Sequence, residues 1–179
     1  STPASCSVGP ASADWSLPTQ QGTREMRTAE DLIREMGMQP IPGEGAWFAP
    51  GPRTQELSSI TVLLTDRADG FSAMHKLEVD EGWQWLDGAP VALLRLRRGG
   101  RGVLNLLDSK QRQILVRRGD WQGAAPMGPW SLVACWCSPA FRDKHFTLGD
   151  ADELTTAFPA FANEIRALTR ETAPPDGPA

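Results

Sequence analysis

Residues 45–148 contain a series of short apolar stretches, each separated from the next by a turn signal. In SSITVLLTD (58–66), the side chains of Ile60, Val62 and Leu64 fall on one face of an extended chain. Between residues 89 and 121, three further β-type runs are separated by Gly-Gly and by DSKQ (108–111), which are both hairpin signals. About seven to nine strands at such spacing predict a jelly roll or small β-barrel rather than alternating β/α units.

A short helix is predicted just before the strands, in TAEDLIREMG (28–37). Thr28 can cap its first turn, Asp31 suits the positive end of the helix dipole, and Gly37 can end the helix. Apolar residues at helical spacing form the expected buried stripe: Leu32, Ile33 and Met36.

Helices are also predicted after the strands. Asp150 and Glu153 have the spacing of a capping pair for ADELTTAF (151–158). Pro159 begins a second helical stretch, and its apolar face contains Phe161, Ile165 and Leu168. The expected fold is therefore all-β, with short α-helices at both ends, and the C-terminal helices should cap or brace the barrel.

The chain of 179 residues fits one domain with extensions at its ends. Residues 1–27 are rich in Ser, Thr, Pro, Gly and Gln, which predicts a flexible N-terminal arm. The stretch RETAPPDGPA (170–179) predicts a disordered tail. The expected single domain is residues 28–169.

Charge and cysteine content narrow the expected partners and compartment. The net charge is -4 and no long Lys/Arg cluster occurs, which argues against nucleic acid as a partner. No apolar run approaches the length of a membrane span, so no membrane partner is expected. Three cysteines, an odd number, favour a reduced, cytoplasmic protein.

The stretch MHKLEVDEGWQWLDG (74–88) contains the strongest candidates for chemistry, His75 and Glu81. A carboxylate beside a histidine stabilises the imidazolium, while burial in an apolar barrel opposes its charge. That balance suits proton transfer near neutral pH. In an arbitrary protein, however, such a pair is more often a satisfied hydrogen-bonded pair than a catalyst.

The spacing of His75, Glu81 and Gly88 resembles the first signature of the cupin superfamily. In that signature, two histidines and a glutamate project inward from adjacent strands to hold a metal. In GDWQGAA (119–125), Gly119 stands in the place of the second signature's glycine and Gln122 in the place of its histidine. The resemblance implies a cupin jelly-roll barrel with His75 and Glu81 facing its cavity.

A closer similarity is to cupin family five, a little-characterised group of single-domain cupins, over most of residues 31–162. PIPGEGAWF (40–48) resembles the family's opening pattern, and SPAF and AFP resemble its closing elements. The central and later motifs are matched at Ser72, His75, Lys76, Asp80, Glu81, Trp83, Gly88, Pro90, Gly119, Trp121 and Gln122. The chain departs from the family at Gln84 and Ile41, where histidine is common, so these two positions lack the titratable or metal-binding groups of the family.

The superfamily's four metal-binding positions are occupied here by His75, Leu77, Glu81 and Gln122. Leucine cannot ligate a metal, and a neutral amide oxygen is a weak donor for Zn or Fe. The other histidine, His145, is expected to be a solvated or capping residue. We therefore expect no metal and no other cofactor, with a weak ion site at His75 and Glu81 left open.

The resemblance extends to function, because some sugar epimerases of the superfamily use metal-free acid–base groups. By that analogy, the expected function is an isomerase, epimerase or cyclase acting on a small molecule, such as a sugar derivative or a secondary metabolite. His75 would act as base or acid, and Glu81 would set its orientation and charge. The alternatives are a non-catalytic small-molecule-binding cupin and a metal-dependent oxygenase or decarboxylase.

Several further residues are expected to contact the substrate, although tryptophans can equally fill a barrel core. The predicted substrate-binding residues are Gln122, Gln84, Trp83, Trp85, Trp121, Trp47 and Glu44. Cys135 and Cys137 should lie on one face of a strand as core or cavity residues. Two chains are expected to pair as a homodimer through their sheets or N-terminal arms.

Overall fold

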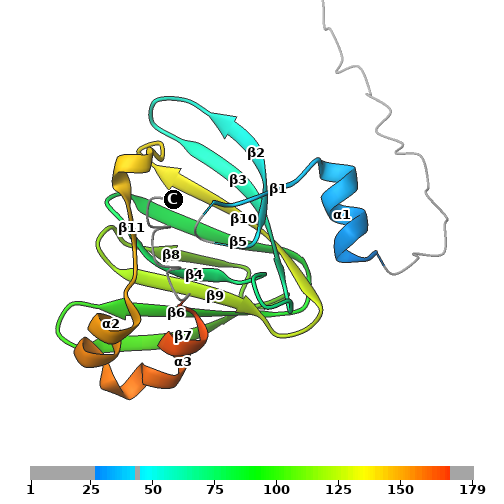
Figure 1. The fold of residues 1–179 in the computed structure, drawn as a ribbon. Coiled ribbons are helices and arrows are strands. Elements are labelled where there is room, and N and C mark those ends of the chain that lie inside the picture. The colour runs from blue at the N-terminus through cyan, green and yellow to red at the C-terminus, as the bar shows by residue number, and fades with distance from the viewer. Residues whose placement is uncertain (1–26, 43–44, 170–179) are drawn as a thin grey trace, which may run out of the picture.

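The computed structural model describes residues 27–42 and 45–169. The predicted arm and tail, together with Glu44, lie outside the described residues, apart from Arg27 at the end of the arm. The described chain forms two antiparallel sheets in a jelly roll, and this confirms the predicted all-β fold (Figure 1).

The first sheet has six strands in the order β1-β2-β3-β10-β5-β8. Their bounds are Gln39–Pro40, Trp47–Arg53, Ser58–Thr65, Trp130–Ser138, Asp80–Gly88 and Gln113–Val116. The second sheet has five strands in the order β11-β4-β9-β6-β7. Their bounds are Phe146–Leu148, Ser72–Leu77, Trp121–Pro126, Val91–Arg97 and Arg101–Leu107.

The main core lies between the two sheets, because strands of both sheets turn alternate apolar side chains inward. Val62 and Leu64 of β3 enter this core, as do Val133 of β10, Leu93 of β6 and Ala124 of β9. Arg95 of β6 joins the sheets beside β7 and β8. Its guanidinium donates to the Asn105 Oδ1 atom at 2.8 Å and to the Leu115 carbonyl at 3.1 Å.

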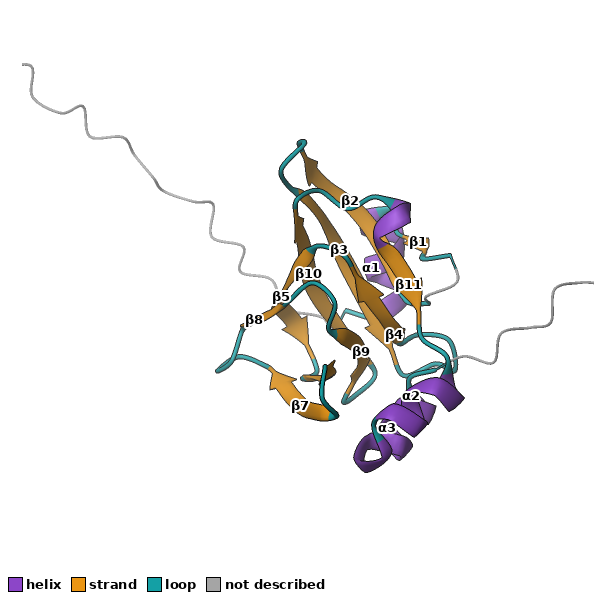
Figure 2. Cartoon of the chain, turned by 90° about the vertical axis from the view of Figure 1, so that its left-hand side faces the viewer, coloured by secondary structure: helices purple, strands orange, loops and turns teal. Residues whose placement is uncertain are grey.

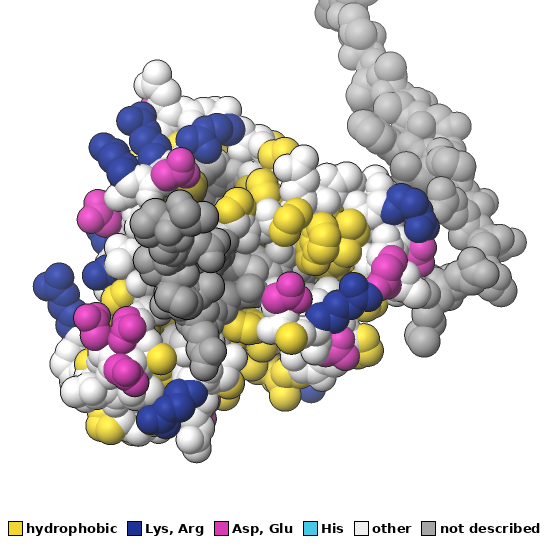
Figure 3. All heavy atoms as spheres, in the orientation of Figure 1, with side chains coloured by type: hydrophobic (Ala, Val, Ile, Leu, Met, Phe, Trp, Pro, Cys, Tyr) yellow, Lys and Arg dark blue, Asp and Glu magenta, His cyan; other side chains and the backbone are white. Residues whose placement is uncertain are grey.

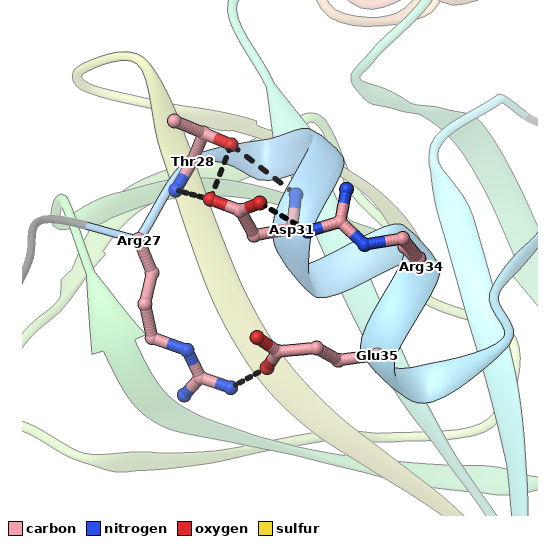
Figure 4. Close-up of polar contacts among 5 residues, drawn as sticks. All are labelled: Arg27, Thr28, Asp31, Arg34 and Glu35. Carbon is pink, nitrogen blue, oxygen red and sulfur yellow. Dashed lines mark hydrogen bonds and ion pairs between the residues drawn. The ribbon is translucent and has the colours of Figure 1, made fainter.

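Helix α1 (Ala29–Met36) packs on the outer face of the first sheet, where Ala29 and Leu32 contact Leu63. Its start is a capping box, since Asp31 N donates to Thr28 Oγ1 at 3.2 Å and Thr28 N donates to Asp31 Oδ2 at 3.1 Å (Figure 4). Bonds donated to the Asp31 carboxylate by Thr28 N, by the Thr28 hydroxyl at 2.8 Å and by Arg34 lower the pKa of Asp31 to about 2. Gly37 ends the helix in the left-handed conformation, as predicted.

Helices α2 (Ala151–Ala157) and α3 (Ala162–Ala167) lie together on the outer face of the second sheet (Figure 2). Asp150 caps α2 by accepting from Glu153 N at 2.9 Å. The predicted apolar face is confirmed, because the helices and sheet share one buried cluster: Met74, Leu94, Leu96, Leu154, Phe158, Phe161, Ile165 and Leu168. The C-terminal helices therefore brace the barrel.

Three expectations for the fold were wrong. Eleven strands occur among the described residues rather than seven to nine, because short edge strands such as β1 and β11 carry no clear pattern. DSKQ does not close a hairpin, since β7 belongs to the second sheet and β8 to the first. Met36 is 36% exposed, because α1 packs on the sheet through Ala29, Leu32 and Ile33.

The surface carries mixed charges. Lys/Arg and Asp/Glu side chains are interspersed over the face shown in Figure 3. No helix in the described part of the chain is both long and apolar enough to cross a bilayer.

Candidate functional site

A cavity of about 590 Å³ lies between the sheets. Its wall is mainly apolar, formed by Ile41, Phe48, Ile60, Val62, Leu77, Trp83, Phe141 and Phe146. The polar groups include His75 and Glu81, together with the thiols of Cys135 and Cys137. A concave apolar wall with a few convergent polar groups is typical of small-molecule sites.

His75 and Glu81 come from opposite walls of the barrel. His75 lies on β4 in the second sheet, and Glu81 lies on β5 in the first. Residues 78 and 79 form the corner that carries the chain between the sheets. Both side chains point inward, and His75 Nε2 lies 3.7 Å from Glu81 Oε2.

The orientation of His75 is set by the backbone and by an aromatic neighbour. Its Nδ1 lies 2.8 Å from the Ala73 carbonyl oxygen, which can only accept, so Nδ1 carries a proton and donates. Phe146 of β11 stacks on the imidazole, with ring centroids 5.3 Å apart and an interplanar angle of 24°. Together these contacts direct Nε2 toward the Glu81 carboxylate.

Glu81 is held by Gln122 of β9. Gln122 Nε2 donates to Glu81 Oε2 at 2.5 Å, while Gln122 Oε1 accepts from Trp83 Nε1 at 2.8 Å. An indole N–H can only donate, so it obliges the amide to present its oxygen to Trp83 and its NH₂ group to Glu81. On the other side, Cys137 Sγ lies 3.9 Å from Glu81 Oε1, within the range of a thiol hydrogen bond.

The whole group is removed from water. His75 is 3% exposed, Glu81 7% and Gln122 1%. Ionised groups interact strongly in such surroundings, and each is costly to bury without partners. The pair can therefore hold or transfer a proton in a site shielded from bulk solvent.

The chain from residue 30 to residue 149 matches the model of the family Cupin_5, described as Cupin superfamily (DUF985). The chain belongs to this family. Two solved structures resemble this cupin over 81% of its length. Protein SO0799 from Shewanella oneidensis is 26% identical with a TM-score of 0.73, and 99% of that chain is covered. A hypothetical protein from Leishmania major is 23% identical with a TM-score of 0.69, and all of it is covered.

A more distant likeness concerns the fold alone. Oxalate decarboxylase from Bacillus subtilis is 11% identical with a TM-score of 0.52. That match covers 76% of this cupin and 40% of the other chain. No curated protein matches the chain.

The residues of this cupin do not suit the metal that the superfamily's signature implies. Gln122 turns its NH₂ group, not its oxygen, toward Glu81, and an N–H group repels a cation. Leu77 has no donor atom. Within residues 27–42 and 45–169, no three His, Cys, Asp or Glu side chains are placed to hold a metal ion. His75 and Glu81 alone would form only a weak site.

Of the tryptophans that we predicted to contact substrate, the structure places Trp83 alone on the cavity wall. Trp85 lies farther along β5, where its Nε1 donates to the Ala89 carbonyl at 3.0 Å and Arg112 covers its ring. Trp121 packs among the residues under α2 and α3, beneath the Lys76 ammonium. Trp47 packs beside α1.

The two predicted glutamines differ in their relation to the site. Neither side chain lines the cavity: Gln122 donates to Glu81, which does line it, whereas Gln84 lies on the other face of β5. Inward positions on β5 are Glu81 and Trp83, so the neighbouring Gln84 points to the opposite face. Substrate contact through Gln122, Gln84, Trp85, Trp121 and Trp47 is therefore not supported by their positions.

Other residues of the site were not singled out from the sequence. Phe146 and Phe141 lie in the wall, yet they follow the last long strand and show no alternating pattern. The available signal was Cys135 and Cys137, whose spacing placed both on one strand face. Both do line the cavity, as one of the two readings required.

Proposed function

We propose that this cupin is a metal-independent enzyme that moves a proton on a small molecule bound in its barrel. The observation that carries the proposal is the buried pair itself. His75 is fixed through Nδ1, so its Nε2 faces both Glu81 and the cavity. A fixed imidazole next to a carboxylate is a suitable general base, and the carboxylate stabilises the imidazolium that forms.

The reaction class that fits is isomerisation, by epimerisation, tautomerisation or ring closure. Neutral His75 would take a proton from the substrate at Nε2, and the imidazolium would return it at another position of the same molecule. Atoms and charge balance without a co-reactant. The role of Gln122 is to keep Glu81 in place, which makes it a positioning residue rather than a catalyst.

A binding protein without turnover is the second candidate, and the large apolar wall favours it. In that case His75 and Glu81 only hydrogen-bond the ligand. Oxygenase or decarboxylase chemistry would need the metal for which the residues are poorly suited, and the likeness to oxalate decarboxylase concerns the fold alone.

The test is exchange of carbon-bound hydrogen with solvent. Cyclic ketones and hydroxyketones, beginning with 1-tetralone, are incubated in D₂O with the protein, and loss of the proton next to the carbonyl is followed by NMR. Wild type should accelerate exchange, and His75→Ala should lower the rate about 10²–10⁴-fold. The matched control is His145→Ala, because His145 Nδ1 accepts from Arg142 N at 3.2 Å outside the cavity.

Glu81→Gln should also reduce exchange, whereas Glu78→Gln on the exposed corner should not. If His75→Ala exchanges each ketone as fast as wild type, the acid–base proposal is wrong. If wild type binds a ketone without accelerating exchange, the binding protein is the better description.

A further inference from the structure

We propose that the ligand of this cavity carries no negative charge, with an apolar ring or chain as its body and a single hydroxyl or carbonyl at its reacting end. Reaction at that end rests on the proposed function, whereas the class of ligand is inferred from the cavity wall. This narrows the range of substrates, because it disfavours sugars, phosphate esters and carboxylic acids.

The charge around Glu81 disfavours an anionic ligand. The groups that face Glu81 are His75, the Gln122 amide and the Cys137 thiol, so no Lys or Arg side chain of the described chain neutralises it there. Among the described residues that line the cavity, Arg53 is the one Lys or Arg, and Asp143 adds a second carboxylate. Arg53 is exposed and donates to the Phe141 carbonyl at 2.6 Å. A phosphate or carboxylate next to Glu81 would meet like charge in a desolvated site.

The hydrogen bonds along the wall disfavour a sugar, because a sugar needs a partner for most of its hydroxyls. Apart from the Asp143 carboxylate, the polar side chains that line the cavity have partners within the protein. Ser58 Oγ accepts from Phe141 N at 2.8 Å, Ser59 Oγ lies 3.3 Å from the Pro52 carbonyl, and the Trp83 indole is engaged by Gln122. Ser72 also has a partner. Burying unpaired hydroxyls against this wall would be unfavourable.

The size of the cavity and its aromatic wall suit a flat apolar ligand body. A cavity of about 590 Å³ is within the usual range for drug-sized ligands. Phe48, Phe141, Phe146 and Trp83 bring four aromatic rings to it, and such rings pack well against flat apolar bodies. The head group would then reach His75 and Glu81 while the body fills the space toward Phe48 and Ile60.

The test uses three probes and measures binding by calorimetry. 2-Naphthylmethanol and 2-naphthoate share one skeleton and differ in head-group charge, and glucose represents a polyol. The alcohol should bind at least about tenfold more tightly than the carboxylate, since one buried like-charge contact costs that much or more. It should also bind more tightly than glucose.

Two pairs of variants locate the binding. Glu81→Gln should narrow the gap between alcohol and carboxylate about tenfold, while the exposed Glu78→Gln should leave it unchanged. Ile60→Trp fills the cavity and should abolish binding of the alcohol. Thr61→Trp, on the opposite face of the same strand, should not.

The proposal is overturned if the carboxylate or glucose binds as tightly as the alcohol. It is overturned equally if the alcohol does not bind, or if Ile60→Trp leaves its binding intact. These results concern binding and are independent of hydrogen exchange. If wild type shows this selectivity of binding but does not accelerate hydrogen exchange, the result would contradict the proposed enzyme activity and leave the ligand class standing.

Discussion

The Trp83 indole donates a hydrogen bond to Gln122 Oε1 at 2.8 Å, and this contact determines which side of the amide faces Glu81. Trp83 belongs to the first sheet and Gln122 to the second, so the bond crosses the barrel. Gln122 holds a superfamily metal-binding position, and here its donor side is turned to the carboxylate. One donor-only side chain thus converts that position into a support for Glu81.

Gln122→Leu should destabilise the protein. It leaves the buried Trp83 N–H without its acceptor and removes a donor from Glu81. The free energy of unfolding, measured by urea denaturation, should fall by about 1–3 kcal/mol. The matched control is Gln84→Leu on the opposite face of β5, which should stay within about 0.5 kcal/mol of wild type. An unchanged midpoint for Gln122→Leu would show that the Trp83–Gln122 bond contributes nothing.

Gln122→His should create a metal site, because it adds an imidazole beside His75 and Glu81. The affinity for Co²⁺, followed by its visible absorption, should rise at least about 100-fold above that of wild type. Gln84→His adds the same group outside the cavity and should have no such effect. Tight, stoichiometric Co²⁺ binding by wild type would contradict the argument from the amide.

Gly82→Ala should destabilise the first sheet. A Cβ at this position would lie 2.0 Å from the Cε2 atom of Trp136, whose indole covers the glycine from the neighbouring strand. Overpacking of this kind costs about 1–3 kcal/mol in unfolding free energy. In Gly82→Ala/Trp136→Ala the clash is absent, so the double variant should be less destabilised than the sum of the single ones. Additive effects would mean that the indole moves aside without cost.

Stability should depend on pH through Asp80. The pKa of this carboxyl is lowered mainly by a hydrogen bond from Arg118 N at 2.9 Å. A second bond, from the Arg117 guanidinium at 3.1 Å, lowers it further. Since the folded pKa is lowered, the contribution of Asp80 is complete above its unfolded value of about 4 and is lost as the pH falls through the folded pKa.

Asp80→Asn should therefore lower the Tm by about 2–4 °C at pH 7 and by less at pH 3. Thermal unfolding at both pH values measures the difference. Asp152→Asn, which changes an exposed carboxylate in the first turn of α2, is the control. An equal loss at both pH values would rule out the ionised carboxylate as the cause.

The homodimer inferred from the sequence stays a prediction, as does its cytoplasmic location. Light scattering on the full chain should give twice the mass of one chain, and dilution should separate the two copies. A monomer mass at every concentration would remove the homodimer.

The sequence predicted the barrel and the facing of His75 and Glu81, because strand spacing and family motifs are both local. It could not predict which tryptophans face the cavity. Trp47 and Trp121 lie on outer faces that α1, α2 and α3 cover, so both faces of these sheets are apolar. Alternation distinguishes inside from outside only where one face meets water.

The connection after β7 was missed for a related reason. Asp108 accepts from Lys110 N and Gln111 N, as in any tight turn, so the local signal is the same whether the chain folds back or changes sheet. The choice depends on β5, which pairs with β8 from far away in sequence.

His75 and Glu81 lie on different sheets, and their side chains meet across the barrel with Nε2 and Oε2 3.7 Å apart. Movement of the two sheets apart would lengthen this distance without breaking any backbone hydrogen bond within either sheet. A ligand that contacts both residues would therefore hold the two sheets together, and a filled cavity would make the barrel harder to open.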